Sequence, residues 1–311
     1  MDRSRVSETT FIILSMASSV ALSYLSGGIF VFTLPMLFLG RRIKRTVNYV
    51  LLQIVTYICV IAVNLLQYRG FFSSPYWGII AFSCLMPFVS ISQTLVYTSM
   101  REKSNSVMRK LVSASIPAFI LGTAFAVWLA SPVGSESFQT LAASIKQSFE
   151  NTNAVMGIDF SQISDLMLPM MLIVMVPASM IFAAFPIIVS EFAANSADEQ
   201  WQYGMANMKM PKKYVLVIAA AVAVTGVSYL VDAVPAYVAV AGWNVGLGMG
   251  LHYVLNGYSI LVAYFRRRTA YVSAARILVL VVVMGFIPGI GFAVYFGLAV
   301  LGILENWIKL R

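Results

Sequence analysis

Apolar runs long enough to cross a lipid bilayer recur along this chain, and they limit its fold more than any other feature. A helix rises about 1.5 Å per residue, so about 20 apolar residues cross a hydrocarbon core of about 30 Å. Runs of this kind cover residues 49–66, 78–100, 111–130, 166–189, 215–231 and 236–265. With 60% hydrophobic residues, 11% charged residues and a mean hydropathy of +0.85, the chain requires lipid as its solvent.

Each end of the chain predicts a helical hairpin. Residues 10–40 are apolar over a length too great for one crossing, and basic residues flank both sides, so we expect a break at Gly27 and Gly28. Residues 275–306 repeat this pattern, with a break at 287–291. We therefore predict an all-α polytopic membrane bundle, a single domain over 1–311, with 8 to 10 transmembrane or re-entrant helices.

Positive charge alternates from one gap between apolar runs to the next. Of the 21 Lys and Arg residues, only Arg69 and Lys146 fall outside one alternate set of gaps. Cytoplasmic loops carry such an excess, which predicts that both termini are cytoplasmic. The net charge of +9 lies in short loops next to the membrane, where anionic lipid accounts for it. We expect the lipid bilayer as a partner and no nucleic acid.

Two segments outside the membrane are predicted to be helical. On the outer side, 137–150 forms an amphipathic helix that lies on the interface. On the cytoplasmic side, 196–210 starts with capping-box spacing from Ser196 to Glu199. Trp201, Met205 and Met208 then follow at helical spacing, which indicates either an interfacial anchor or a docking face for a partner.

Motifs for catalysis are missing from the sequence. It contains one histidine, His252, and no metalloprotease, P-loop or nucleophile-elbow motif, so we expect no enzyme. Cys59 and Cys84 lie inside apolar runs, so no metal site is predicted, and no cofactor is expected.

The richest polar stretch covers 242–258, where glycines occur at nearly alternate positions. Asn244, His252 and Asn256 fall within a sector of about 120° of a helix, with Tyr253 and Tyr258 as neighbours. A polar stripe in lipid needs a partner. It serves either for hydrogen bonding between helices or as one wall of a solute-binding pocket.

Several pieces of the chain resemble one family. The segment 208–211 that runs directly into a span, the stretch from Asn244 to Leu261 followed by basic residues, and the ending 302–311 resemble the YybS-like family of bacterial membrane proteins. That family is similar in membrane layout to the substrate-binding subunits of energy-coupling-factor vitamin transporters. The resemblance implies that Ala17 and Ala21 contact a transmembrane coupling subunit, which works with an ATPase in a bacterial inner membrane.

Two functions follow as hypotheses. The first is a multi-pass inner-membrane protein that binds or helps to transport a small solute, as a transporter subunit without an energising motif of its own. The broken terminal hairpins and the polar stripe favour it, because transporters hold substrates at interrupted helices. The alternative is a non-transporting scaffold that recruits envelope or cytoplasmic partners through the helix at 196–210 and the basic loops.

Overall fold

The computed structural model is a bundle of α-helices, without a strand among the residues that it describes. These are residues 8–25, 30–40, 42–43, 46–67, 69, 77–100, 107–156, 161–195, 198–268, 273–285, 287 and 290–310. Within them, 7 helices are long and apolar enough to cross a membrane, and the shorter apolar helices are Val31–Gly40, Ala274–Gly285 and Ile290–Leu304. The prediction of an all-α bundle of membrane-length helices is confirmed, whereas the number of full crossings stays a prediction.

The six long apolar runs in the interior of the sequence all form helices. They are α3 (Thr46–Gln67), α4 (Trp77–Ser99), the consecutive α5 (Val107–Pro117), η4 (Ala118–Gly122) and α6 (Thr123–Ala130), α8 (Ser161–Asn195), α10 (Lys213–Leu230) and α11 (Ala236–Arg268). Only 11% of the apolar window of α10 is buried, so most of its apolar side chains point away from the protein. Such an outward apolar surface is stable in lipid and unstable in water.

The apolar runs at the two ends of the chain each form a pair of helices. The elements are α1 (Glu8–Leu25), the 3-10 turn η1 (Phe30–Thr33), α2 (Leu34–Gly40), α12 (Ala274–Gly285) and α13 (Ile290–Leu304). In each pair the two helices contact one another, as the predicted hairpins require. The expected break at Gly27 and Gly28 lies outside the described residues. A Cβ at Gly291 would overlap the carbonyl oxygen of Gly285, so the second turn is too tight for a side chain there.

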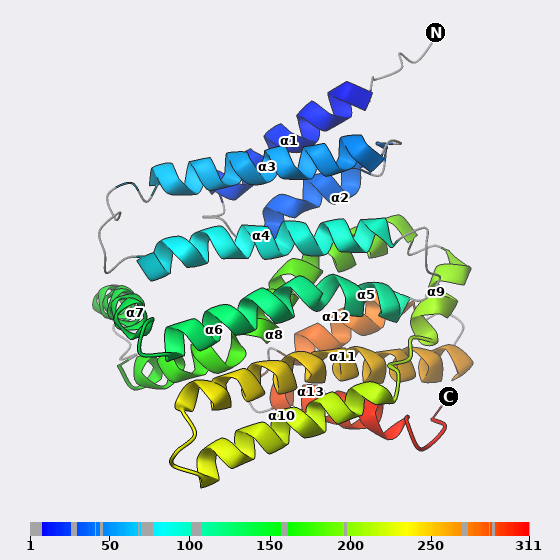
Figure 1. The fold of residues 1–311 in the computed structure, drawn as a ribbon. Coiled ribbons are helices and arrows are strands. Elements are labelled where there is room, and N and C mark those ends of the chain that lie inside the picture. Colours follow the sequence, from blue (N-terminus) through cyan, green and yellow to red (C-terminus); the bar gives the residue numbers. More distant parts are fainter. Residues whose placement is uncertain are drawn as a thin grey trace.

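Two further helices lie at opposite ends of the bundle. α7 (Ser135–Met156) is seen nearly end-on at the left of Figure 1, whereas α9 (Glu199–Ala206) lies at the right, near the end of the chain. Phe138 of α7 packs against a cluster of buried side chains from α6 and α8, and Gln147 is exposed. This orientation agrees with the amphipathic helix predicted for 137–150.

The start of α9 differs from the prediction. Its N-cap is Asp198, because the Asp198 carboxylate accepts a hydrogen bond from the backbone N–H of Gln200 at 2.8 Å. The predicted cap Ser196 lies outside the described residues. Met205 on the apolar side of the helix and Met208, just after the end of the helix, turn into the protein and are 6% and 2% exposed. The spacing of these two methionines therefore reflects packing against the other helices of the protein. Neither side chain is accessible to a docking partner.

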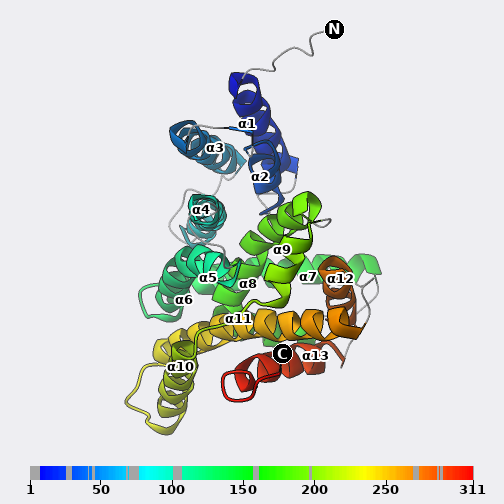
Figure 2. The same cartoon turned by 90° about the vertical axis from the view of Figure 1, so that its right-hand side faces the viewer.

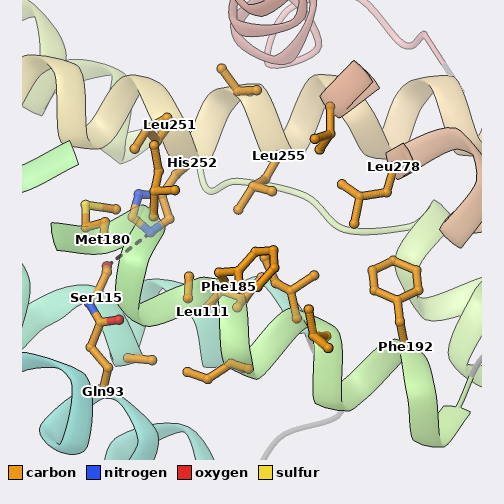
Figure 3. A pocket seen from close by; sticks show the side chains of 18 of the residues that line it. Gln93, Leu111, Ser115, Met180, Phe185, Phe192, Leu251, His252, Leu255 and Leu278 are labelled. Atoms are coloured by element: carbon orange, nitrogen blue, oxygen red, sulfur yellow. Dashed lines mark hydrogen bonds between the residues drawn. The ribbon is translucent and has the colours of Figure 1, made fainter. Parts of the chain in front are cut away.

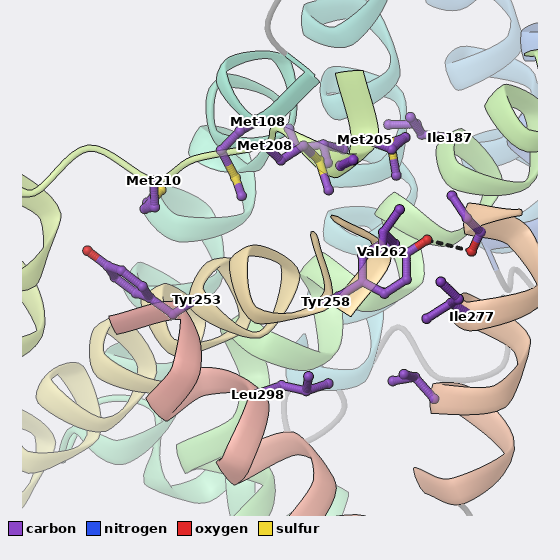
Figure 4. Close-up of a cluster of buried hydrophobic side chains, with 14 of the residues drawn as sticks. Met108, Ile187, Met205, Met208, Met210, Tyr253, Tyr258, Val262, Ile277 and Leu298 are labelled. Carbon is purple, nitrogen blue, oxygen red and sulfur yellow. Dashed lines mark hydrogen bonds between the residues drawn. The ribbon is translucent and has the colours of Figure 1, made fainter. Parts of the chain in front are cut away.

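The largest cluster of buried apolar side chains surrounds the second half of α11 and is rich in methionine (Figure 4). Its members include Met108, Ile187, Met205, Met208, Met210, Tyr253, Tyr258, Val262, Ile277 and Leu298. Methionine is flexible and fills irregular gaps between helices. The cluster joins α9 and the segment that follows it to the helices of the bundle.

α11 is the central helix of this half of the molecule and contacts α6, α8, α10 and α13 (Figure 2). Its contact with α13 is close because glycines face backbone across it. A Cβ at Gly257 would overlap the carbonyl oxygen of Leu298, and a Cβ at Gly302 would overlap the carbonyl oxygen of Tyr253. Small residues permit this approach between membrane helices.

We expect Gly257→Ala to destabilise the bundle by about 1–3 kcal/mol, since backbone atoms of α13 would have to move. Gly250→Ala on the same helix is the control, because nothing lies within 4 Å of the added Cβ. Thermal unfolding in detergent measures both variants. Equal melting temperatures for the two would contradict the close contact between α11 and α13.

Cysteine labelling tests the arrangement of helix ends. In a variant that lacks Cys59 and Cys84, a cysteine placed at the exposed Gln147 and one placed at the exposed Asn207 should react with an impermeant maleimide from opposite sides of the membrane. The reason is that α7 and α9 lie at opposite ends of the bundle. Reaction of both positions from the same side would contradict a membrane-spanning arrangement of these helices.

Candidate functional site

A cavity of about 510 Å³ lies between α4, α5, α8, α11 and α12 (Figure 3). Most of its lining is aliphatic or aromatic, which is typical of sites for small organic molecules. The lining residues are Gln93, Leu111, Ala114, Ser115, Met180, Ile181, Ala184, Phe185, Ile187, Ile188, Val189, Phe192, Leu251, His252, Val254, Leu255, Ala275, Leu278, Val279, Val282 and Val283. None of these lining residues carries a formal charge at neutral pH, with His252 neutral.

Three polar side chains, Gln93, Ser115 and His252, gather at one end of the cavity, which we call the polar end. They come from α4, α5 and α11, and Figure 3 shows them on the side opposite to Phe192 and Leu278. The Ser115 hydroxyl lies 3.1 Å from Nε2 of His252. Gln93 is 1% exposed, and no hydrogen-bond partner meets its Nε2 atom.

A wide turn in the neighbouring helix holds His252 in place. Pro117 lacks an N–H and cannot continue the regular hydrogen-bond ladder, and η4 follows it as a π-helical turn. Phe119 in this turn stacks on the imidazole, with a distance of 6.0 Å between ring centroids and an interplanar angle of 17°. On the other side, Nδ1 of His252 lies 3.2 Å from the carbonyl oxygen of Gly248. The ring is therefore fixed by stacking and by both nitrogen atoms.

Asn244 joins α11 to α8 beside Pro177. Its Nδ2 donates to the carbonyl oxygen of Leu172 at 2.6 Å, and its Oδ1 accepts from the N–H of Val176 at 2.8 Å. In a regular helix those two backbone groups would pair with each other. The amide of Asn244 thus forms hydrogen bonds with both backbone groups in the turn of α8 that precedes the proline. Insertion of a side chain into the hydrogen-bond ladder is one of the usual causes of a helix kink.

Asn256 joins α11 to α13 and to the segment that links α9 to α10. Its Nδ2 donates to the carbonyl oxygen of Gly302 at 2.7 Å, and its Oδ1 accepts from the N–H of Met210 at 3.3 Å. Ser259 donates to the carbonyl oxygen of Met208 at 2.8 Å. These bonds hold the 208–210 segment against α11.

The predicted stripe on α11 therefore divides between packing and the cavity. His252 lines the cavity, whereas Asn244, Tyr253, Asn256 and Tyr258 do not. Tyr253 is fully buried in the methionine-rich cluster, and the Tyr258 hydroxyl donates to the carbonyl oxygen of Ala274 at 2.6 Å, shown by the dashed line in Figure 4. The amides of both asparagines are occupied by backbone groups.

Gln93 and Ser115 belong to the cavity but were not singled out in the sequence. A glutamine inside an apolar run is itself a signal, because a buried polar side chain in lipid is costly unless it has a partner or a function. Ser115 carries a weaker signal, since serine occurs often in membrane helices and bonds its own backbone. Here its hydroxyl also lies 2.7 Å from the carbonyl oxygen of Val112.

The residues predicted to contact partners lie elsewhere on the protein. On α1, Ala17 and Ala21 are exposed, whereas Ser15, Ser19 and Ser23 are fully buried on another face. Trp201 of α9 is half-buried and packs edge-on against Phe192, with ring centroids 4.9 Å apart. The exposed face of α1 remains open to a transmembrane partner, and Trp201 contacts the protein's own α8.

Within the described part of the chain, no group of three or more His, Cys, Asp or Glu side chains is placed to hold a metal ion. Comparisons with protein-family models, curated proteins and solved structures found no match to this chain. The resemblance to the YybS-like family therefore stays a prediction. The class of protein supported by the fold is a helical bundle of membrane-length helices with an apolar cavity between them.

We expect Asn256→Leu to lower the stability of the protein in detergent without closing the cavity. A hydrogen bond between membrane helices contributes about 0.6 kcal/mol on average and up to about 1.7 kcal/mol, and Asn256 makes two such contacts. Ser228→Ala is the control, because the Ser228 hydroxyl bonds only within α10, to Val224 at 2.8 Å. An unchanged melting temperature for Asn256→Leu would contradict its role in holding helices together.

Proposed function

We propose that this chain is a multi-pass protein of a bacterial inner membrane that binds a small, largely apolar solute in the cavity. It would serve as a solute-binding subunit of a transporter whose energy comes from other subunits. The cavity is the observation on which this proposal depends. Its volume of about 510 Å³ lies inside the range of about 300–1,000 Å³ that ligand pockets occupy.

The rim of the cavity supports access from lipid. Ile181 and Phe185 on α8 and Val279 and Val283 on α12 line the cavity and are also 48–62% exposed. These apolar side chains would face hydrocarbon in a membrane, so a solute already dissolved in the bilayer could pass between α8 and α12. A strongly hydrated solute would find few hydrogen-bonding groups along this path.

The transporter role also draws on the sequence. The chain has no motif for ATP hydrolysis, so directed transport would need a partner that supplies energy. The exposed face of α1 with Ala17 and Ala21 is our candidate contact for a coupling subunit that works with an ATPase. The end of the bundle near α9 would face the cytoplasm, because the basic last turn of α11 and the lysines before α10 lie there. A scaffold role through α9 is less favoured, since Met205 and Met208 are buried.

Filling the cavity tests solute binding. The protein is purified in mild detergent, extracted with organic solvent, and the extract is analysed by mass spectrometry. Ala184 lines the cavity, so Ala184→Trp should occupy the space and remove any small molecule that copurifies with the wild-type protein. We expect the signal of that molecule to fall by about tenfold or more, since its binding free energy would be lost.

The matched control is Ala220→Trp on α10, which places the same side chain on an exposed position outside the cavity. This variant should retain the copurifying molecule. Identical extracts from the wild-type protein and both variants would contradict the proposed function.

A further inference from the structure

Gln93 is buried with an unused hydrogen-bond donor. It lies on α4, is 1% exposed, lines the cavity, and no partner meets its Nε2 atom. In Figure 3 its side chain extends toward Ser115 at the polar end. A buried donor without a partner costs about 1–3 kcal/mol, and a bound group that accepts its hydrogen bond would recover this cost.

The pair formed by Ser115 and His252 lacks a hydrogen-bond donor, because the acceptor atoms around it outnumber its hydrogens. The carbonyl oxygen of Gly248 can only accept, so a neutral imidazole that donates to it carries its hydrogen on Nδ1 and has Nε2 as an acceptor. The hydroxyl of Ser115 has a single hydrogen, and it faces two acceptors: the carbonyl oxygen of Val112 at 2.7 Å and Nε2 of His252 at 3.1 Å. When this hydrogen serves Val112, the pair can accept one more hydrogen bond.

We propose that the polar end binds the uncharged hydroxyl group of an amphiphile whose hydrocarbon part fills the rest of the cavity. This inference rests on the proposed function and names the chemical class of its solute. A hydroxyl oxygen accepts the N–H of Gln93, and its hydrogen is donated to the Ser115–His252 pair. One small group thereby satisfies both needs of the polar end.

The absence of charge along the cavity lining selects a neutral head group over an anionic one. A carboxylate or a phosphate transferred to this site would lose its hydration without gaining a cationic partner, which costs several kcal/mol. The remaining lining residues, which include Leu111 and Val283, are apolar. Such a lining binds a hydrocarbon chain because it buries the apolar surface of that chain. The exposed apolar rim on α8 and α12 gives such an amphiphile a path from the bilayer.

Photolabelling with three probes that share one tail tests the proposal. Each probe is a 16-carbon chain with a diazirine near its end, and the head is a primary alcohol, a carboxylic acid or a plain methyl group. The wild-type protein in lipid nanodiscs is irradiated with equal amounts of each, and labelling of lining peptides is measured by mass spectrometry. We expect the alcohol to label about fivefold more than either of the other probes, as one or two net hydrogen bonds would give.

Gln93→Leu should reduce the preference for the alcohol over the methyl probe to about one while the cavity still labels, because leucine keeps the volume and removes the donor. Gln53→Leu is the matched control. Gln53 is also 1% exposed and its amide atoms also lack partners, but it lies on α3 away from the cavity. It should leave the preference unchanged.

The outcomes separate the two proposals. Equal labelling by the alcohol and methyl probes in the wild-type protein, or equal labelling by the acid, would overturn the hydroxyl site while leaving an apolar solute in place. Absence of specific labelling by all three, relative to Ala184→Trp, would overturn the proposed function as well. The wild-type comparison decides the matter even where Gln93→Leu fails to fold.

Discussion

The hydrogen bonds of the two asparagine side chains on α11 organise the half of the bundle that contains the cavity. In an apolar solvent a polar group must find its partner inside the protein, so each amide brings the backbone of another element to α11. Asn244 meets the turn of α8 before Pro177, and Asn256 meets α13 and the 208–210 segment. With glycine at 257 and 302, α13 also approaches closely enough for backbone contact.

The cavity follows from the same arrangement. α11 is held to α8 on one side and to α13 on another, and α12 extends from its hairpin with α13 without closing fully on α8. The space between them is lined by apolar side chains except where α4, α5 and α11 bring Gln93, Ser115 and His252 together. The π-helical turn after Pro117 is part of this geometry, because it places Phe119 against the imidazole. A proline in one helix thus helps to shape a site on another.

The helices and the paired helices at both ends were predictable because hydropathy and length decide them in a bilayer. The pairing of side chains was less predictable. Asn244, His252 and Asn256 share one sector of α11, yet the structure assigns them to three different neighbours, and only His252 faces the cavity. Helical spacing tells which residues share a face but not which element lies opposite. The same limit explains α9, where the N-cap is Asp198 and Met205 turns inward.

By itself, the sequence determined the all-α class, the approximate helix bounds, the pairs of apolar helices at both ends, and the need for partners along α11. These properties depend on local composition and on the apolar solvent, so short segments of the sequence are enough to predict them. Only the tertiary structure decided that Gln93, Ser115 and His252, which are far apart in sequence, meet at one end of an apolar cavity. That meeting depends on the π-helical turn after Pro117 and on glycine contacts between helices, and neither can be read from a single helix. The solute class that we propose depends on this long-range geometry.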